Sequence, residues 1–251
     1  MLITLLGIFS GLLLGLTGGG GAIVSVPALV YGLHIPMQVA TTLSLFVVGG
    51  SSMLGTYLKR KEVDWKKGFI FAIFGGLASP IGSYLAKHIN EDVLIGSFAI
   101  LMLLVSFLMI RKSMSKNNLS SKNNRINYKA YSIWQTLPVG LITGLLTGFF
   151  GVGGGFMIVP ALVLLNRMEN KSATATSLFI ITLISLISIM GKAQEIELDF
   201  ILIIIFMTGS IVGMIIGNII SQKISSQLSQ RIFAIVAFIL GIYMLLDSLF
   251  L

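Results

Sequence analysis

The sequence predicts an all-α polytopic membrane protein made of two homologous repeats. Its 251 residues are 55% hydrophobic and 10% charged, with a mean hydropathy of +0.98, whereas soluble domains carry about 25% charged residues. Eight long apolar runs divide the chain, and the first half matches the second at a constant offset. Together these observations exclude an ordinary soluble domain.

Six of the apolar runs have about the 20 residues with which a helix crosses a hydrocarbon core of about 30 Å: residues 38–58, 68–86, 93–110, 172–190, 200–221 and 232–250. The other two, residues 2–33 and 134–165, hold 32 residues each, which is too few for two full crossings. Each half therefore combines three full spans with one longer segment, giving 8–10 membrane elements in all.

Both long runs contain a glycine cluster at which we expect the helix to break. The first reads LTGGGGAIVSVPALV from Leu16 to Val30. Glycine costs about 1 kcal/mol relative to alanine in a helix interior, and proline costs about 3 kcal/mol. The predicted breaks are Gly18–Gly21 and Gly151–Gly155. Backbone opened at membrane depth is tolerated only where protein or a water-filled cavity surrounds it.

A shift of 133 residues aligns the two halves without a gap through these clusters. It places GLLLGLTGGGGAIVSVPALV on GLLTGFFGVGGGFMIVPALV and ATTLSLF on ATATSLF. With two residues inserted, GSYLA at 82–86 falls on GNIIS at 217–221. The domains predicted from this repeat are a first transmembrane repeat at 1–111, a polar basic linker at 112–132 and a second transmembrane repeat at 133–251.

Positive charge is concentrated in two loops between apolar runs. Residues 59–67 and 111–129 hold eleven of the seventeen Lys and Arg residues. Because basic loops of membrane proteins face the cytoplasm, we expect loops 59–67 and 112–130 to be cytoplasmic in a multi-pass protein of the inner membrane. The net charge of +8 then reflects membrane topology, and we expect the lipid bilayer and no nucleic acid as a partner.

The path of the broken segments stays open between two topologies. If 134–165 crosses the membrane once, the acidic loop 191–199 is cytoplasmic. If the segment enters and returns as two half-helices, that loop faces out, whereas Lys171 and Lys223 face in. We favour the second topology, which fits the charge rule better. Each repeat then has five elements, so the two repeats are inverted relative to each other.

Side chains that carry chemistry are scarce in the apolar runs. The sequence has no cysteine and only His34 and His88, both at run edges, and Asp247 is the one charged residue inside a run. These residues supply neither a metal site nor a placed acid–base pair. We therefore expect no enzyme, no metal and no cofactor.

The two glycine breaks are the predicted binding site for a small anionic substrate. A helix that restarts after a break presents backbone N–H groups and a partial positive charge, and paired breaks in repeated transporters lie at the substrate site. The predicted substrate-binding residues are the break glycines and the hydroxyl residues that open the next helix: Gly18, Gly19, Gly20, Gly21, Thr41, Thr42, Ser44, Gly151, Gly153, Gly154, Gly155, Thr174, Thr176 and Ser177.

Other small residues are assigned to helix packing, as is common in membranes. These are the scattered glycines Gly49, Gly50, Gly75 and Gly76. Ser52 and Ser185 lie mid-span in corresponding places, and for them packing and a role in lining the substrate path are weighed equally.

The doubled pattern of a glycine cluster, VPALV and a helix opened by ATATSL resembles the TauE/SafE sulfite exporter family, also called the 4-toluene sulfonate uptake permease family. The resemblance covers nearly the whole chain. It implies a prokaryotic inner-membrane transporter of sulfur oxyanions and organosulfonates. The first half departs from the pattern, with Thr42 and Leu43 where the second half has Ala175 and Thr176.

The function predicted on these grounds is secondary transport of small sulfur-containing anions, with the anion held at a central site between the two broken helices. The alternatives are a passive anion channel and a structural or assembly protein of the membrane that transports nothing. Which anion is carried, the direction of transport, the coupling ion and the oligomeric state stay open.

Overall fold

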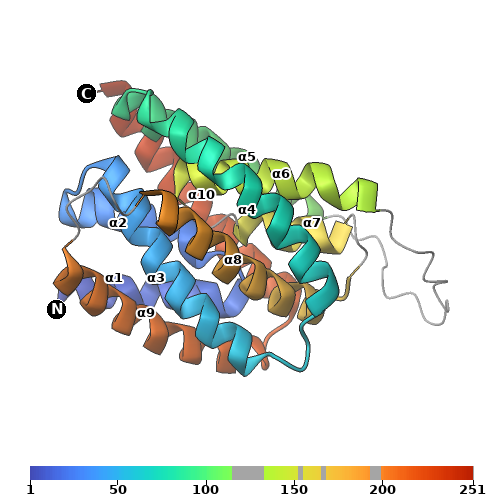
Figure 1. Cartoon of the computed structure of the whole chain (residues 1–251). Helices are drawn as coiled ribbons and strands as arrows, with labels where there is room; N and C mark the ends of the chain where they lie inside the picture. The colour runs from blue at the N-terminus through green and yellow to red at the C-terminus, as the bar shows by residue number, and fades with distance from the viewer. Residues whose placement is uncertain (115–132, 152–154, 165–167, 193–198, 251) are drawn as a thin grey trace.

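The chain is all-helical in its computed structural model, which describes residues 1–114, 133–151, 155–164, 168–192 and 199–250 and contains no strand in them (Figure 1). The first half forms α1 (Leu2–Thr17), α2 (Gly21–Leu33), α3 (Met37–Leu58), α4 (Trp65–Lys87) and α5 (Glu91–Met114). The second half forms α6 (Ile133–Phe150), α7 (Gly155–Leu164), α8 (Asn170–Lys192), α9 (Phe200–Ser221) and α10 (Ser226–Phe250). Most of the predicted linker at 112–132 lies outside the described residues.

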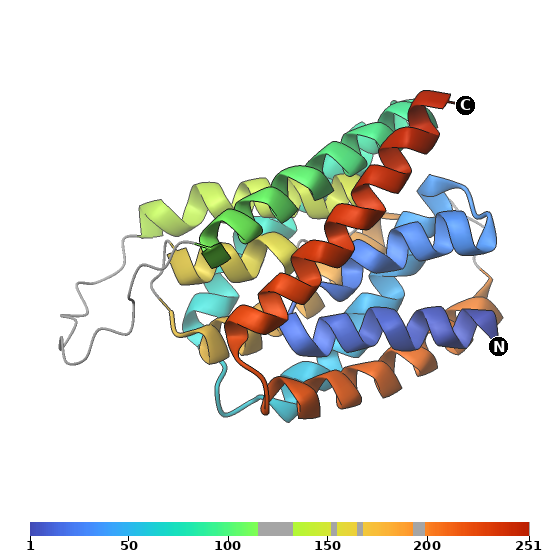
Figure 2. The same cartoon turned by 180° about the vertical axis from the view of Figure 1, so that it is seen from behind.

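Six of these helices, α3, α4, α5, α8, α9 and α10, are long and apolar enough to cross a membrane. They correspond to the six full spans expected from the sequence and confirm a polytopic all-α fold. In α3 and α8, 72% and 67% of the apolar window is buried inside the protein, against 33% in both α5 and α10. The pair α3 and α8 therefore forms the centre, and α5 and α10 pack together on the face seen in Figure 2.

The first broken segment turns back on itself as a helical hairpin. Gly18 ends α1 with φ +77°, a left-handed conformation that glycine adopts readily. Ser10 Oγ of α1 lies 2.6 Å from Ser25 Oγ of α2, and a Cβ atom added at Gly32 would lie 2.7 Å from Leu6 Cδ1. Later residues of α2 thus pack on earlier residues of α1, so the two helices are antiparallel.

The second broken segment has the same turn. Gly151 follows α6 with φ +63°, and α7 runs back beside α6 (Figures 1 and 2). Each half thus has five helices in the same order, with the left-handed glycine after the first helix. Of the two paths considered for the broken segments, this geometry is that of two half-helices.

Each hairpin docks on the fourth helix of the other half. Helix α1 packs on α9, and α6 packs on α4. A Cβ atom at Gly11 of α1 would lie 1.9 Å from the Ser210 carbonyl oxygen, and one at Gly213 of α9 would lie 2.0 Å from the Ile8 carbonyl oxygen. The two backbones therefore touch directly, as small residues allow in membranes.

The second docking repeats this geometry. A Cβ atom at Gly144 of α6 would lie 2.0 Å from the carbonyl oxygen of Gly75 on α4, and one at Gly148 would lie 1.8 Å from that of Ser79. The assignment of Gly75 to helix packing is confirmed. The halves exchange equivalent contacts, as a pseudo-two-fold axis would require, and their superposition stays a prediction.

Replacing Gly11 by Leu should sharply reduce the yield of folded protein, because the new side chain would overlap the backbone of α9. Overpacking commonly costs about 1–3 kcal/mol, and a backbone that cannot move aside should put Gly11→Leu at the upper end. Fluorescence-detected size exclusion and the thermal midpoint measure the effect. Gly191→Leu is the matched control, since a Cβ atom there meets no described atom within 4 Å. Equal behaviour of the two variants would contradict the docking.

Candidate functional site

The start of α8 holds the first glycine break. A Cβ atom at Gly18 would lie 2.4 Å from Thr174 Cγ2. Ser177 Oγ donates to the carbonyl oxygens of Gly18 at 2.6 Å and Thr174 at 2.8 Å. The predicted residues Gly18, Thr174 and Ser177 are therefore brought together.

The start of α3 holds the second break in the same way. A Cβ atom at Gly151 would lie 2.3 Å from Thr41 Cβ. Ser44 Oγ donates to the carbonyl oxygen of Gly151 and, at 2.9 Å, to that of Thr41. Each break is thus fixed by a helix from the other half, through residues 133 positions apart in the two copies.

The two serine hydroxyls are engaged with the protein rather than aimed at a ligand. Ser44 and Ser177 give their protons to break carbonyls, and Thr41 and Thr42 donate to the Gln38 carbonyl oxygen at 2.8 and 3.1 Å. In this state the two serine hydroxyls position the backbone of the breaks, the two threonine hydroxyls bond to the first turn of α3, and the role of all four as ligands stays a prediction.

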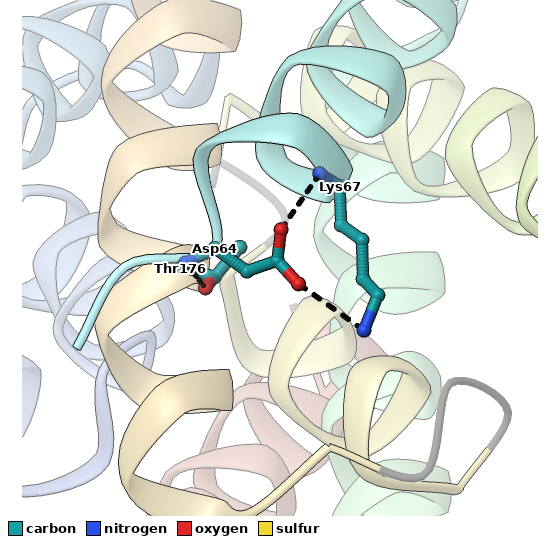
Figure 3. Close-up of polar contacts among 3 residues, drawn as sticks. All are labelled: Asp64, Lys67 and Thr176. Atoms are coloured by element: carbon teal, nitrogen blue, oxygen red, sulfur yellow. Dashed lines mark hydrogen bonds and ion pairs between the residues drawn. The ribbon is translucent and has the colours of Figure 1, made fainter. Parts of the chain in front are cut away.

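Thr176 points away from the breaks and fixes the loop before α4. Its hydroxyl accepts from the backbone N–H of Asp64 at 2.9 Å (Figure 3). Asp64 in turn caps α4 by accepting from the Lys67 N–H at 3.1 Å and pairs with Lys67 Nζ at 3.1 Å. The first half has Leu43 at the position of Thr176, and Leu43 packs in an apolar cluster.

The two breaks meet in the middle of the protein. A Cβ atom at Gly19 would lie 2.1 Å from the Gly155 carbonyl oxygen, so no space for a ligand separates these two residues. Gly20 donates its N–H to Thr17 Oγ1 at 2.8 Å, and Gly21 begins α2. Gly153 and Gly154 lie outside the described residues. The anion site was expected between the two broken helices, and at Gly19 and Gly155 the breaks are in contact.

A pocket of about 450 Å³ opens at the end of the protein where α3 ends and α8 begins. Its lining includes four basic residues, Lys59, Arg60, Lys61 and Lys171, and one acidic residue, Glu62. Leu16, Thr174 and Asn218 also line it. The pocket therefore joins a basic surface to residues that lie next to Gly18.

Among the charged residues of the pocket, Lys59 lies partly out of water, whereas Arg60, Lys61, Glu62 and Lys171 are exposed. Burial lowers the pKa of the Lys59 ammonium, and nearby Glu62 opposes that shift. The Arg60 guanidinium carbon lies 4.7 Å from the centre of the Tyr57 ring, in a cation–π contact that leaves guanidinium N–H donors available. Four cations beside one carboxylate favour an anion as the ligand of the pocket.

Asn218 is the pocket residue that the sequence analysis missed. Its side chain is 8% exposed, and within the described chain its Oδ1 atom has no hydrogen-bond partner. The aligned residue of the first half is Ser83, whose hydroxyl donates to the Gly148 carbonyl oxygen at 3.2 Å. The sequence feature that could have identified this residue is an asparagine inside an apolar span, at a position where the other repeat has serine.

Ser52 and Ser185 are fully buried, and their hydroxyls have no hydrogen-bond partner among the described residues. Ser185 Cβ lies 3.0 Å from a Cβ atom added at Gly49, so this serine is packed between α3 and α8. A role for the two serines in lining the substrate path stays a prediction.

Comparison with known proteins identifies similar chains along most of the sequence. The model of the family described as "Sulfite exporter TauE/SafE" matches residues 3–244. A "Probable membrane transporter protein" of Xylella fastidiosa (strain 9a5c) is 31% identical over 204 residues, which cover 80% of this chain and 77% of that protein. "Probable membrane transporter protein YunE" of Bacillus subtilis (strain 168) is 32% identical over 205 residues, covering 74% and 75%. No solved structure matches the chain significantly.

Replacing Ser177 or Ser44 by Ala should lower thermal stability, because each change leaves a buried break carbonyl without its donor. An unsatisfied buried group costs about 1–3 kcal/mol, which corresponds to a fall of several degrees in the thermal midpoint. Thermal unfolding in detergent measures it. Thr208→Ala is the control, since the Thr208 hydroxyl donates only within its own exposed turn. A midpoint for Ser177→Ala equal to that of Thr208→Ala would show that Ser177 does not hold the break.

Proposed function

The chain belongs to the TauE/SafE sulfite exporter family, and we propose that it is a secondary transporter of small sulfur-containing anions, such as sulfite or an organosulfonate. Its relatives are named as probable membrane transporters, and its six long apolar helices make it a multi-pass protein of the cell membrane. Catalysis has no part in the proposed function.

The observation that carries the proposal is the contact between the two glycine breaks. Helix α2 begins at Gly21 and α7 begins at Gly155, so both N-termini lie beside the contact of Gly19 with Gly155. Each N-terminus carries about half a positive charge. The sequence places no Asp or Glu in either broken segment, 2–33 or 134–165. Two positive helix ends in segments that carry no carboxylate favour a small anion.

The neutral lining suits an oxyanion that must be released again. Backbone N–H groups and hydroxyls each contribute modestly to anion binding, whereas a buried lysine or arginine would hold the anion more firmly. In the proposed cycle, the glycine breaks separate to admit the anion, and Gly18, Gly20, Gly151 and Gly153 lie at the site.

Alternating access fits the inverted arrangement of repeats that we propose. The pocket at the basic end is open, and by the positive-inside rule this end faces the cytoplasm. At the opposite end, Met37 at the start of α3 is buried, and its N–H donates to the carboxylate of Glu91. The start of α8, the equivalent in the second repeat, lines the open pocket. Unequal surroundings at the starts of the equivalent helices α3 and α8 fit a carrier that opens on one side at a time.

A passive anion channel has less support, because Gly19 and Gly155 are in contact where the two breaks meet. A membrane assembly protein would not need a duplicated break. We therefore retain transport as the function to be tested first.

Purified protein in proteoliposomes should take up a sulfur-containing anion with saturation, and uptake should rise when the same anion is present inside. Sulfite, sulfate, thiosulfate, taurine and sulfoacetate are the test solutes, and an uncharged sugar alcohol is the control. Exchange stimulated from the far side distinguishes a carrier from a channel. Movement of uncharged solutes alone would contradict anion transport, and unsaturable flux without exchange would favour the channel.

A further inference from the structure

The pocket at the basic end has features that membrane topology alone does not require. The positive-inside rule asks only that Lys and Arg lie on one side of the membrane. Here Lys59, Arg60 and Lys61 from the end of α3 gather with Lys171 from the start of α8. Lys66 lies in the same basic stretch but does not line the pocket.

Resting on the proposed transport of anions, we propose that this pocket is a separate loading site, at which an oxyanion binds before it reaches the glycine breaks. Lys59, Arg60 and Lys171 hold its negative charge. Asn218 and Thr174 contact its polar atoms at the inner end of the pocket.

The charge balance of the pocket supports an anionic ligand. Four basic side chains face one carboxylate, Glu62, and the pKa of the partly buried Lys59 is lowered by burial. An anion bound beside this partly buried ammonium would favour its charged form. Arg60 can donate two parallel N–H groups to two oxygens of one oxyanion.

Asn218 is a buried polar residue of the pocket lining whose amide is not fully paired within the part of the chain that the structure describes. The residue is more than nine-tenths buried and lines the pocket, and its Oδ1 atom, itself buried, has no hydrogen-bond partner among the described residues. An unpaired buried polar group is costly and needs a partner. The amide can turn about its Cβ–Cγ bond, so it can donate to a sulfonate oxygen or accept from a protonated group. Its counterpart Ser83 has a protein partner instead.

The pocket also leads to the break. Thr174 and Leu16 line it, and Thr174 lies against Gly18. An anion at Asn218 and Thr174 is therefore next to the turn whose carbonyl Ser177 holds. When the two breaks separate, the anion can then move from the pocket to the site between them.

The volume admits either an inorganic oxyanion or one with a small organic group. About 450 Å³ lies within the usual range of ligand pockets, roughly 300–1,000 Å³. Leu16, Tyr57 and Ile224 add apolar lining. Sulfite and sulfoacetate share the oxyanion head, so both are used as probes and the one with the lower KM identifies the better fit.

The test uses the full chain in membrane vesicles of both orientations. Uptake of sulfite and of sulfoacetate is measured at low and high salt for Lys171→Gln, Lys171→Arg, Asn218→Leu and Lys66→Gln. With the basic end facing the medium, Lys171→Gln should raise KM about ten-fold at low salt, and Asn218→Leu should raise it several-fold. Lys171→Arg and the control Lys66→Gln should stay within about two-fold of the wild-type KM.

Comparing the two vesicle orientations distinguishes a role of these residues in binding from a role in stability. With the opposite end facing the medium, every variant should keep the wild-type KM, and every variant should match the wild-type thermal midpoint. If the wild-type protein moves no anion, the proposed function is wrong and the loading site falls with it. If the wild-type protein transports but Lys171→Gln and Asn218→Leu match Lys66→Gln, the loading site is wrong and the transport function stands.

Discussion

Backbone contact between α1 and α9, and between α6 and α4, is the constraint on which the rest of this structure depends. In a lipid bilayer there is no hydrophobic driving force between apolar helices, so close van der Waals packing must hold them together. Gly11 and Gly144 allow that contact in the two halves. Because each hairpin docks on the opposite half, its tip is carried to the centre of the protein, where Gly19 meets Gly155.

The docked hairpins explain why an opened backbone is tolerated inside an apolar protein. Ser177 satisfies the carbonyl of Gly18, and Ser44 satisfies that of Gly151. The two ends differ around this symmetric centre: cations and Asn218 line an open pocket at one end, whereas at the other end the carboxylate of Glu91 accepts from the first N–H of α3. A symmetric frame with unequal ends suits a protein that alternates between two states.

The sequence predicted those features that composition and spacing determine locally. Helix-breaking glycines located the breaks at Gly18 and Gly151, and apolar run lengths identified the six spans. The repeat placed Thr174 and Thr41 in equivalent positions but did not show that each contacts the break of the other half. The hydrogen-bond partner of Thr176 could not be predicted from the sequence either. Its hydroxyl accepts from the Asp64 N–H, and this contact exists only because α8 packs against the loop before α4 in the folded protein. The pocket was missed because its residues are far apart in the chain.

The hairpin path of the broken segments is the central claim, and one cross-linking measurement tests it directly. Ser10→Cys and Ser25→Cys are introduced together into this cysteine-free chain, because their hydroxyl oxygens lie 2.6 Å apart across the hairpin. Mild oxidation in native membranes should form a disulfide that blocks both thiols from a maleimide reagent until it is reduced. In one continuous helix these residues would be about 22 Å apart, beyond the reach of a disulfide. Two thiols that stay reactive after oxidation would contradict the hairpin and the central meeting of the breaks.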